Sequence, residues 1–334
     1  MSVYLDGPVP WLFDPESEAL AALARDAEAR LADTPCGDLR EDAALLEQLL
    51  RERHFGVANG VVDVPRIELP AARTWGDLAG LQAELRTALG DNHVRFYGTR
   101  AEPRRADGPA VERREVDGVL VLRVQRLFGT PDDDRALREW VAGADGDFAY
   151  DRVVVDLRGN TGGNDGFTYR WAERRLRGVE AFARDSSWHV GGTLLAFWNR
   201  GVWQRALHGT ELPEPLAGEL EVADETDDLP AGDRPWDGRM LVLVDRLTRS
   251  SGESSAWLLR QGLGARLLGE PTFGMIEYGN VVPYVLPRTG LAISLPTKRN
   301  DYGFAVEGVG FPVDVSLDPA TPVEDVARQF ESFV

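Results

Sequence analysis

Four short apolar runs constrain the fold of this 334-residue chain more than any other feature of its sequence. They cover residues 118–124, 152–157, 240–244 and 266–269. Continuous runs of valine and leucine of this length are typical of strands that are buried on both faces of a sheet. Helical patterns lie between the runs, as in residues 132–142 and 253–261. Strands that alternate with helices predict an α/β core from about residue 116 to the C-terminus.

The N-terminal region has a helical pattern instead. Leucines recur at helical spacing over residues 15–53, and a further helix is expected over residues 74–89. Gly90 follows, as is common after the last turn of a helix, so Asp91-Asn92-His93 is expected in a turn or at the start of a strand. Residues 100–115 are polar and rich in Arg, Glu and Pro, which predicts a linker or an exposed loop.

The composition excludes several classes of partner. Apolar residues make up 43% of the chain and charged residues 28%, as in ordinary globular proteins. The formal net charge of −18 is spread along the chain and repels nucleic acid and anionic lipid, so neither is expected to bind. No apolar run approaches the ~20 residues of a membrane span, and no signal peptide is recognisable, which predicts a cytoplasmic protein. The single cysteine, Cys36, excludes an intramolecular disulfide.

A glycine-rich turn follows the second apolar run, with the sequence Asp156-Leu157-Arg158-Gly159-Asn160-Thr161-Gly162-Gly163. Backbone N–H groups that no side chain covers can bind an anion or stabilise a developing oxyanion. The same glycines would equally serve a tight turn that binds nothing. A phosphate-binding loop is a poor match, because its Gly-Lys-Ser/Thr ending is absent.

A serine-rich segment, residues 247–255, follows the third apolar run and opens a helix. A serine at such a junction points its hydroxyl outward near the positive end of the helix, which favours a nucleophile there. On spacing alone, the N-cap of the helix is the simpler explanation of such a serine.

The order of four motifs carries a resemblance that no single motif does. Asp-Leu-Arg-x-Asn-x-Gly-Gly is followed by Ser-x-x-Glu, then Gly-Glu-Pro-Thr-Phe-Gly, then Glu-Gly-Val-Gly, at residues 156–163, 250–253, 269–274 and 307–310. Over about residues 116–318 this series resembles the S41 serine peptidases, the group of C-terminal processing proteases and the tricorn core. The resemblance implies their crotonase-like (ClpP-like) ββα fold. The expected domains are an N-terminal helical domain that ends in the histidine-bearing element, a linker and an S41-like catalytic core, at residues 1–95, 96–117 and 118–334.

The resemblance also implies roles for individual residues. Ser250 matches the nucleophile of the family, and Glu253 completes its motif as a supporting residue. The backbone N–H of Ser251, together with that of Gly162 or Gly163, matches the oxyanion hole.

The resemblance identifies the base that activates the serine less directly than it identifies the serine itself. Members with a Ser-Lys dyad place the lysine directly after Thr-Phe-Gly, where this chain has Met275, which cannot accept a proton. His93 resembles the histidine of the tricorn-like branch, and Glu307 matches the carboxylate that orients it; Asn92 would add a hydrogen bond. The sole lysine, Lys298, lies in a polar stretch typical of a solvated loop and is the remaining candidate.

These assignments predict a serine hydrolase that cleaves peptide bonds through an acyl-enzyme, with a peptide or protein substrate and no metal or other cofactor. Too few residues separate His93 from residue 118 for the PDZ module that many members carry. A homo-oligomer is a further expectation. Two alternatives stay open: a non-catalytic protein on the same fold that binds a peptide or an apolar ligand, and an acyl-transfer, cyclising or esterase enzyme of a biosynthetic pathway. The other histidines, His54, His189 and His208, are expected to be structural.

Overall fold

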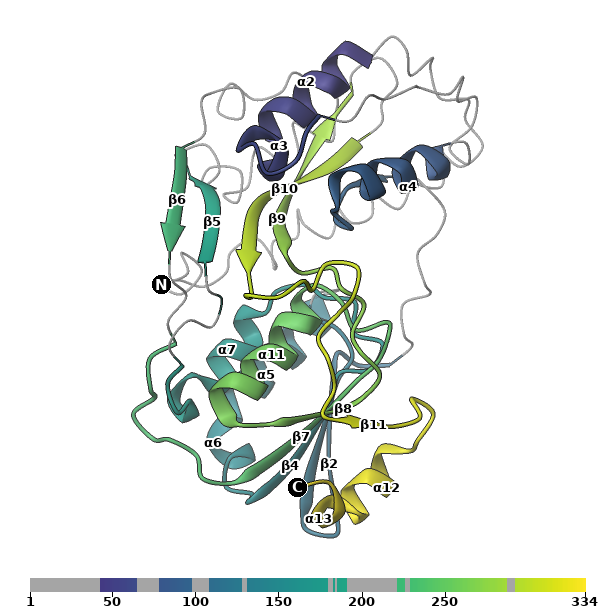
Figure 1. The fold of residues 1–334 in the computed structure, drawn as a ribbon. Helices are drawn as coiled ribbons and strands as arrows, with labels where there is room; N and C mark the ends of the chain where they lie inside the picture. The colour runs from purple at the N-terminus through teal and green to yellow at the C-terminus, as the bar shows by residue number, and fades with distance from the viewer. Residues whose placement is uncertain are drawn as a thin grey trace.

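The computed structural model describes residues 43–64, 78–97, 108–127, 131–179, 183, 185–190, 221–225, 229–286 and 292–334. Within them the chain forms two β-sheets with helices packed against them. Figure 1 shows one sheet above the other, with loops between them. Cys36 and His208 lie outside the described residues, as does the part of the expected helical domain before residue 43.

The lower sheet in Figure 1 has six strands in the order β11-β8-β7-β4-β3-β2. They are β2 (Val111–Val116), β3 (Val119–Val124), β4 (Arg152–Asp156), β7 (Arg239–Val244), β8 (Arg266–Gly269) and β11 (Val315–Ser316). All neighbours pair in parallel except β2, which is antiparallel to β3. The four strands predicted from apolar runs are therefore confirmed as β3, β4, β7 and β8, side by side at the centre of a mixed sheet.

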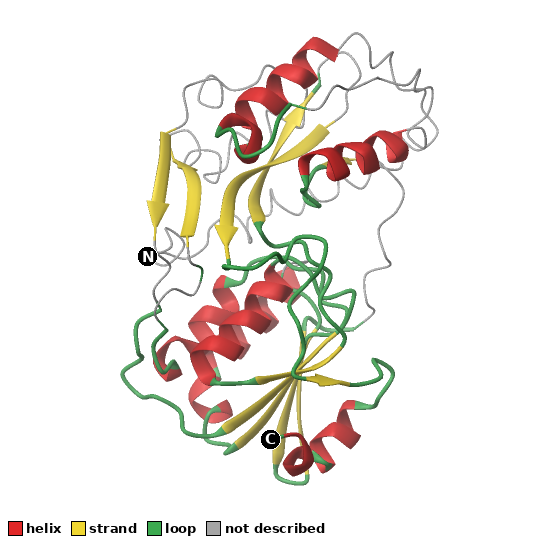
Figure 2. Ribbon diagram, in the orientation of Figure 1, coloured by secondary structure: helices red, strands yellow, loops and turns green. Residues whose placement is uncertain are grey.

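Helices cover both faces of this sheet, which explains why its central strands β3, β4, β7 and β8 are apolar at nearly every position (Figures 1 and 2). On one face lie α5 (Pro131–Ala142), α6 (Ala144–Asp147), α7 (Gly166–Ala172), η4 (Glu173–Arg175) and α11 (Ser251–Leu263), and on the other α12 (Val323–Arg328) and α13 (Phe330–Phe333). Successive residues of β3 alternate between the two cores: Leu120 packs on the α11 side, whereas Val121 packs on the α12 side. Removal of apolar surface on both faces stabilises this sheet.

The upper sheet is formed by β1 (Arg95–Tyr97), β5 (Asp185–Val190), β6 (Glu221–Glu225), β9 (Tyr278–Val285) and β10 (Ala292–Asp301). β10 pairs antiparallel with β1, β5 and β9, and β5 pairs with β6. The helices α2 (Ala43–Arg53), α3 (Phe55–Ala58) and α4 (Leu78–Leu89) pack on this sheet through contacts with β10 and β1. The N-terminal helices therefore share a core with strands from the last fifth of the chain.

Two segments differ from their predicted conformation. Residues 296–300, expected as a solvated loop, belong to β10, so Lys298 lies in a strand, opposite Trp188 of β5 and Gly279 of β9. Residues 111–116, expected within the linker, form the edge strand β2, which is largely exposed and hence polar. The proposed division into a helical domain, a linker and a core stays a prediction. No helix among the described residues is long and apolar enough to cross a membrane.

Candidate active site

Ser250 stands where the chain turns from β7 into α11. It is the N-cap of α11, with φ +52° and ψ −124°, a backbone conformation that side chains rarely adopt and that is found mostly at functional sites. Its N–H donates to the carboxylate of Glu253 at 2.9 Å, one turn into the helix. The N-cap interpretation is therefore correct for the backbone, but it does not account for the strained φ or for what the hydroxyl contacts.

The Ser250 hydroxyl contacts His93, which comes from the upper half of the molecule. Ser250 Oγ lies 3.2 Å from His93 Nε2, although 157 positions separate the two residues in the chain. α4 ends at Leu89 as predicted, Gly90 adopts φ +59°, and His93 lies in the turn before β1. The Ser294 hydroxyl of β10 donates to His93 O at 3.0 Å and so fixes the backbone of this turn to the upper sheet.

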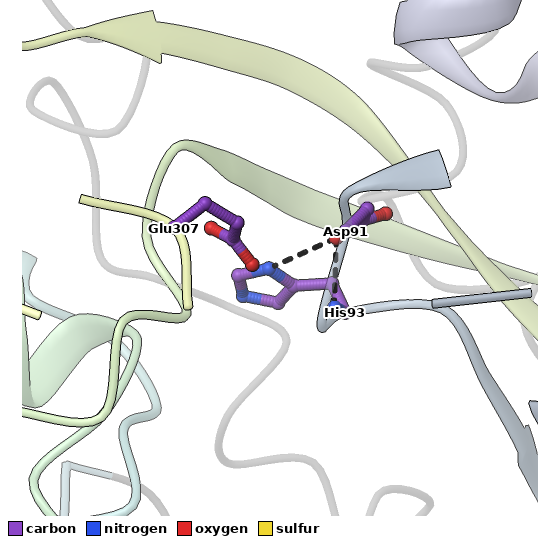
Figure 3. A group of neighbouring side chains, drawn as sticks. All are labelled: Asp91, His93 and Glu307. Carbon is purple, nitrogen blue, oxygen red and sulfur yellow. Dashed lines mark hydrogen bonds and ion pairs between the residues drawn. The ribbon is translucent and has the colours of Figure 1, made fainter. Parts of the chain in front are cut away.

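Two carboxylates flank the other side of the His93 ring, as Figure 3 shows. Asp91 Oδ1 lies 3.6 Å from His93 Nδ1 and accepts the His93 backbone N–H at 2.7 Å. Glu307 belongs to the same cluster, in which one ligand atom from each residue lies within 4.8 Å of the others. His93 Nδ1 is buried and has no hydrogen-bond partner among the described residues, so both carboxylates act on it through charge.

Glu307 is held by backbone groups. Oε1 accepts the N–H of Asn92 at 2.8 Å, and Oε2 accepts those of Ile276 and Glu277, both at 3.0 Å. Burial raises the pKa of Glu307 to about 7, against the attraction of His93 and these hydrogen bonds. The Asn92 side chain donates to Gly274 O at 3.0 Å, so Asn92 connects the turn of His93 to two loops of the lower half.

Glu253 joins the serine to the loop that follows β8. Its carboxylate, which is fully buried, accepts the Thr272 hydroxyl at 2.6 Å and the N–H groups of Gly274 and Met275 at 2.8 and 2.9 Å, besides that of Ser250. Burial raises the pKa of Glu253, and these hydrogen bonds oppose the rise. Two of the sequence motifs, at residues 250–253 and 269–274, thus meet at one carboxylate.

The glycine-rich turn lies against the start of α11. Gly162 N–H donates to Asn160 Oδ1 at 2.9 Å, and the Asn160 side chain is anchored to Val124 O at 2.9 Å. The Ser251 hydroxyl donates to Gly163 O at 2.8 Å. In the part of the chain that the structure describes, the N–H groups of Ser251 and Gly163 donate to no other group. Of the two candidate glycines, Gly163 is the one with a free donor.

The donor set does not favour a metal ion in the cluster of Asp91, His93 and Glu307. All four carboxylate oxygens already accept N–H groups: those of Asp91 from the His93 backbone and His54, and those of Glu307 from three backbone N–H groups. A cation would have to displace these donors. The arrangement fits a buried imidazole between two carboxylates instead.

The structure brings together Ser250, Ser251, Glu253, His93, Asn92, Glu307 and the glycine turn, all of which the sequence singles out. Lys298 lies along β10 in the upper sheet, and no hydrogen bond between the described residues joins it to Ser250. Sequence reasoning did not single out the contact between Asp91 and His54. Asp91 had two signals. It begins Asp91-Asn92-His93, which resembles the Asp-Gly-His element of the family, and it stands two residues before His93, where a short acidic side chain often accepts the N–H of the second following residue. His54 had none.

Comparisons with known proteins find a peptidase family and a common fold. The model of peptidase family S41 matches residues 119–315. A protein from Parabacteroides merdae ATCC 43184, described as a candidate peptidase, has the same fold with a TM-score of 0.52 at 12% identity, covering 87% of this chain and 92% of that one. A lipoprotein from Streptococcus agalactiae gives a TM-score of 0.48 at 12% identity, with 100% of both chains covered. The photosystem II D1 C-terminal processing protease gives 0.39 at 17% identity, covering 71% of this chain and 52% of that one. No curated protein matches the sequence.

Proposed function

The chain belongs to peptidase family S41 and is a serine-type peptidase, and from that premise we propose that it cleaves peptide bonds through an acyl-enzyme on Ser250. The observation that carries the proposal is the 3.2 Å contact between Ser250 Oγ and His93 Nε2. A serine hydroxyl is a weak nucleophile at neutral pH and needs a base at hydrogen-bond distance. His93 supplies that base, because the lysine of the dyad is replaced by Met275.

In the first step, Ser250 Oγ attacks the carbonyl carbon of the scissile bond while His93 Nε2 takes the hydroxyl proton. Negative charge then develops on the carbonyl oxygen, and the N–H groups of Ser251 and Gly163 stabilise it in this proposal. We assign the oxyanion hole to these two donors rather than to Gly162, because the Gly162 N–H is already bound to Asn160.

In the second step, the imidazolium of His93 gives its proton to the leaving amine as the C–N bond breaks, and Ser250 keeps the acyl group. Water then attacks the ester with His93 again as the base, which releases the carboxylic acid and restores the serine. Glu307 acts as the orienting acid: its carboxylate faces the His93 ring and stabilises the positive charge that forms there. Asn92 holds Glu307 in place, and Glu253 holds Ser250.

The test is covalent labelling with an alkyl fluorophosphonate on wild type, Ser250→Ala and His93→Ala. Wild type should be labelled at Ser250, as found by mass spectrometry of the digested protein, and both variants should lose nearly all labelling. Normal labelling of His93→Ala would move the base elsewhere, with Lys298 as the next candidate. A wild-type protein that is folded but not labelled would favour a binding protein over an enzyme. Mass spectrometry of peptide products separates hydrolysis from acyl transfer.

A further inference from the structure

A line of buried polar side chains continues from His93 away from the serine. Asp91 Oδ1 lies 3.6 Å from His93 Nδ1, and Asp91 Oδ2 lies 3.2 Å from His54 Nε2. The side chains of Asp91 and His54 are both 0% exposed. A buried carboxylate is costly unless hydrogen bonds satisfy it, so this pair is a specific arrangement rather than a solvated surface contact.

Hydrogen bonding defines the protonation of His54. The Val57 N–H donates to His54 Nδ1 at 3.3 Å, so this nitrogen keeps its lone pair and the ring hydrogen is on Nε2. The Nε2–H therefore donates to Asp91 Oδ2. Because a ring with a lone pair on Nδ1 is neutral, Asp91 carries the full negative charge of the pair and faces His93 with it.

The two carboxylates around His93 differ in the pH range over which they are charged. Burial acts to raise the pKa of Asp91, but the hydrogen bond from His54 and the attraction of His93 outweigh it and lower the pKa to about 2. Burial raises the pKa of Glu307 to about 7. Near neutral pH, Asp91 is therefore ionised throughout, whereas Glu307 is partly protonated.

We infer that Asp91 and His54 are positioning residues, which hold the His93 ring toward Ser250 and stabilise the imidazolium that forms when His93 takes the serine proton. The inference rests on the proposed function and extends it, because the sequence assigns this role to Glu307 alone and treats His54 as structural. Asp91 acts through His93, and His54 acts through Asp91; neither touches the substrate. An aspartate behind a catalytic histidine fixes its orientation in the same way in other serine hydrolases.

The experiment uses kinact and KI for an alkyl fluorophosphonate, so it needs no knowledge of the natural substrate. In His54→Phe the ring packing against Tyr278, at 5.4 Å between centroids, is kept while the N–H donor is lost. We expect kinact to fall about tenfold in His54→Phe and about 100-fold in Asp91→Asn, with KI close to wild type. His54→Gln, whose amide can still donate to Asp91, should recover most of the kinact lost in His54→Phe.

The pH profile of kinact/KI separates a positioning role from a structural one. Without the N–H donor of His54, Asp91 attracts the proton of the His93 imidazolium more strongly. The acid limb of the kinact/KI profile should therefore move to higher pH. Asp91→Asn removes the negative charge, so the limb should move to lower pH. Arg86 and Tyr278, which also face Asp91 from α4 and β9, and Glu307 are unchanged in every variant.

The matched control is Asn59→Ala. Asn59 donates to Phe55 O at 2.8 Å at the other end of α3, so this variant weakens the same short helix without touching Asp91. A His54→Phe protein with the kinact and acid limb of Asn59→Ala would overturn the inference, and so would an Asp91→Asn protein that labels like wild type. Failure of the proposed function would appear instead in wild type, as a folded protein that the probe does not label.

Discussion

Gly162 brings the backbone closer to Ser250 than a residue with a Cβ atom ordinarily lies. A Cβ atom built on Gly162 would lie 3.0 Å from Ser250 Cβ and 3.2 Å from Ser251 N, and the residue has φ +105°. We expect Gly162→Ala to displace the donors of the proposed oxyanion hole and to lower the rate of fluorophosphonate labelling about 100-fold. Gly159→Ala is the control, because Gly159 has φ +75° in the same turn but nothing within 4 Å of its Cβ position. Equal labelling of the two variants would contradict this account of Gly162.

The residues at the site differ in how far the sequence could foretell them. Ser250, His93 and Glu307 lie in motifs that resemble a known family, and the structure brings them together. Asp91 and His54 form a buried pair that depends on how α3 packs beside the turn after α4, 37 positions further along the chain. No local pattern encodes such a contact. Side chains that act through tertiary packing were therefore not predictable in the way that a motif is.

At the scale of elements, Thr272 fixes the loop after β8 to the start of α11. Its hydroxyl donates to Glu253 at 2.6 Å and accepts the Phe311 N–H at 2.8 Å, so one buried side chain holds three segments. We expect Thr272→Val to lose about 2 kcal/mol or more of unfolding free energy, because it leaves buried polar groups unsatisfied. Labelling of Ser250 should slow about tenfold, since Glu253 also holds the Ser250 backbone.

Thr297→Val provides the comparison for that prediction. Thr297 is also buried, and its hydroxyl donates to Asn280 O at 2.7 Å within the upper sheet, away from α11. This variant should lose about 1 kcal/mol of unfolding free energy, measured by urea denaturation. Its Ser250 should be labelled by the fluorophosphonate at the wild-type rate. If both threonine variants label normally, Thr272 contributes to stability alone.

The elements themselves were predictable where burial is complete. β3, β4, β7 and β8 are covered on both faces, so their sequences are apolar at nearly every position. The end of β10 was not predicted as a strand, because its polar residues Lys298, Arg299 and Asn300 form a run that is typical of a loop. What makes this segment a strand is its pairing with β9 on one side and, on the other, with β5, which lies far from β10 in the sequence.

At the scale of the whole molecule, the site lies where the two sheets meet. Ser250 comes from the lower sheet and its helices, whereas His93 comes from the upper sheet, and neither half holds both residues. Glu307 joins the halves, because it accepts N–H groups from Asn92 on one side and from Ile276 and Glu277 in the loop between β8 and β9. The carboxylate of Glu277 in turn accepts the N–H groups of Val306 and Glu307 at 2.7 and 3.0 Å.

This junction should make the stability of the protein depend on pH through Glu307. Its pKa rises from 4.5 to about 7 in the folded protein, so the folded state binds the proton more tightly than the unfolded state. The stabilisation that this provides is fully present below about pH 4.5 and is lost as the pH rises through 7, a change of up to about 3 kcal/mol. Asp91 acts in the opposite sense but only at lower pH, since its pKa falls from 3.8 to about 2.

Urea denaturation of wild type and Glu307→Gln between pH 5 and 8 measures this contribution. The difference in unfolding free energy between the two proteins should change with pH in favour of Glu307→Gln as the pH rises, because glutamine does not ionise. Glu47→Gln, at an exposed position on α2, is the control for the loss of one carboxyl group elsewhere in the protein. Glu253 also has a raised pKa but is present in all three proteins, so its contribution cancels. A difference for Glu307→Gln that stays constant across this range would mean that Glu307 is ionised in the folded protein well below pH 7. Glu307 would then share with Asp91 the charge that faces His93 at all working pH values.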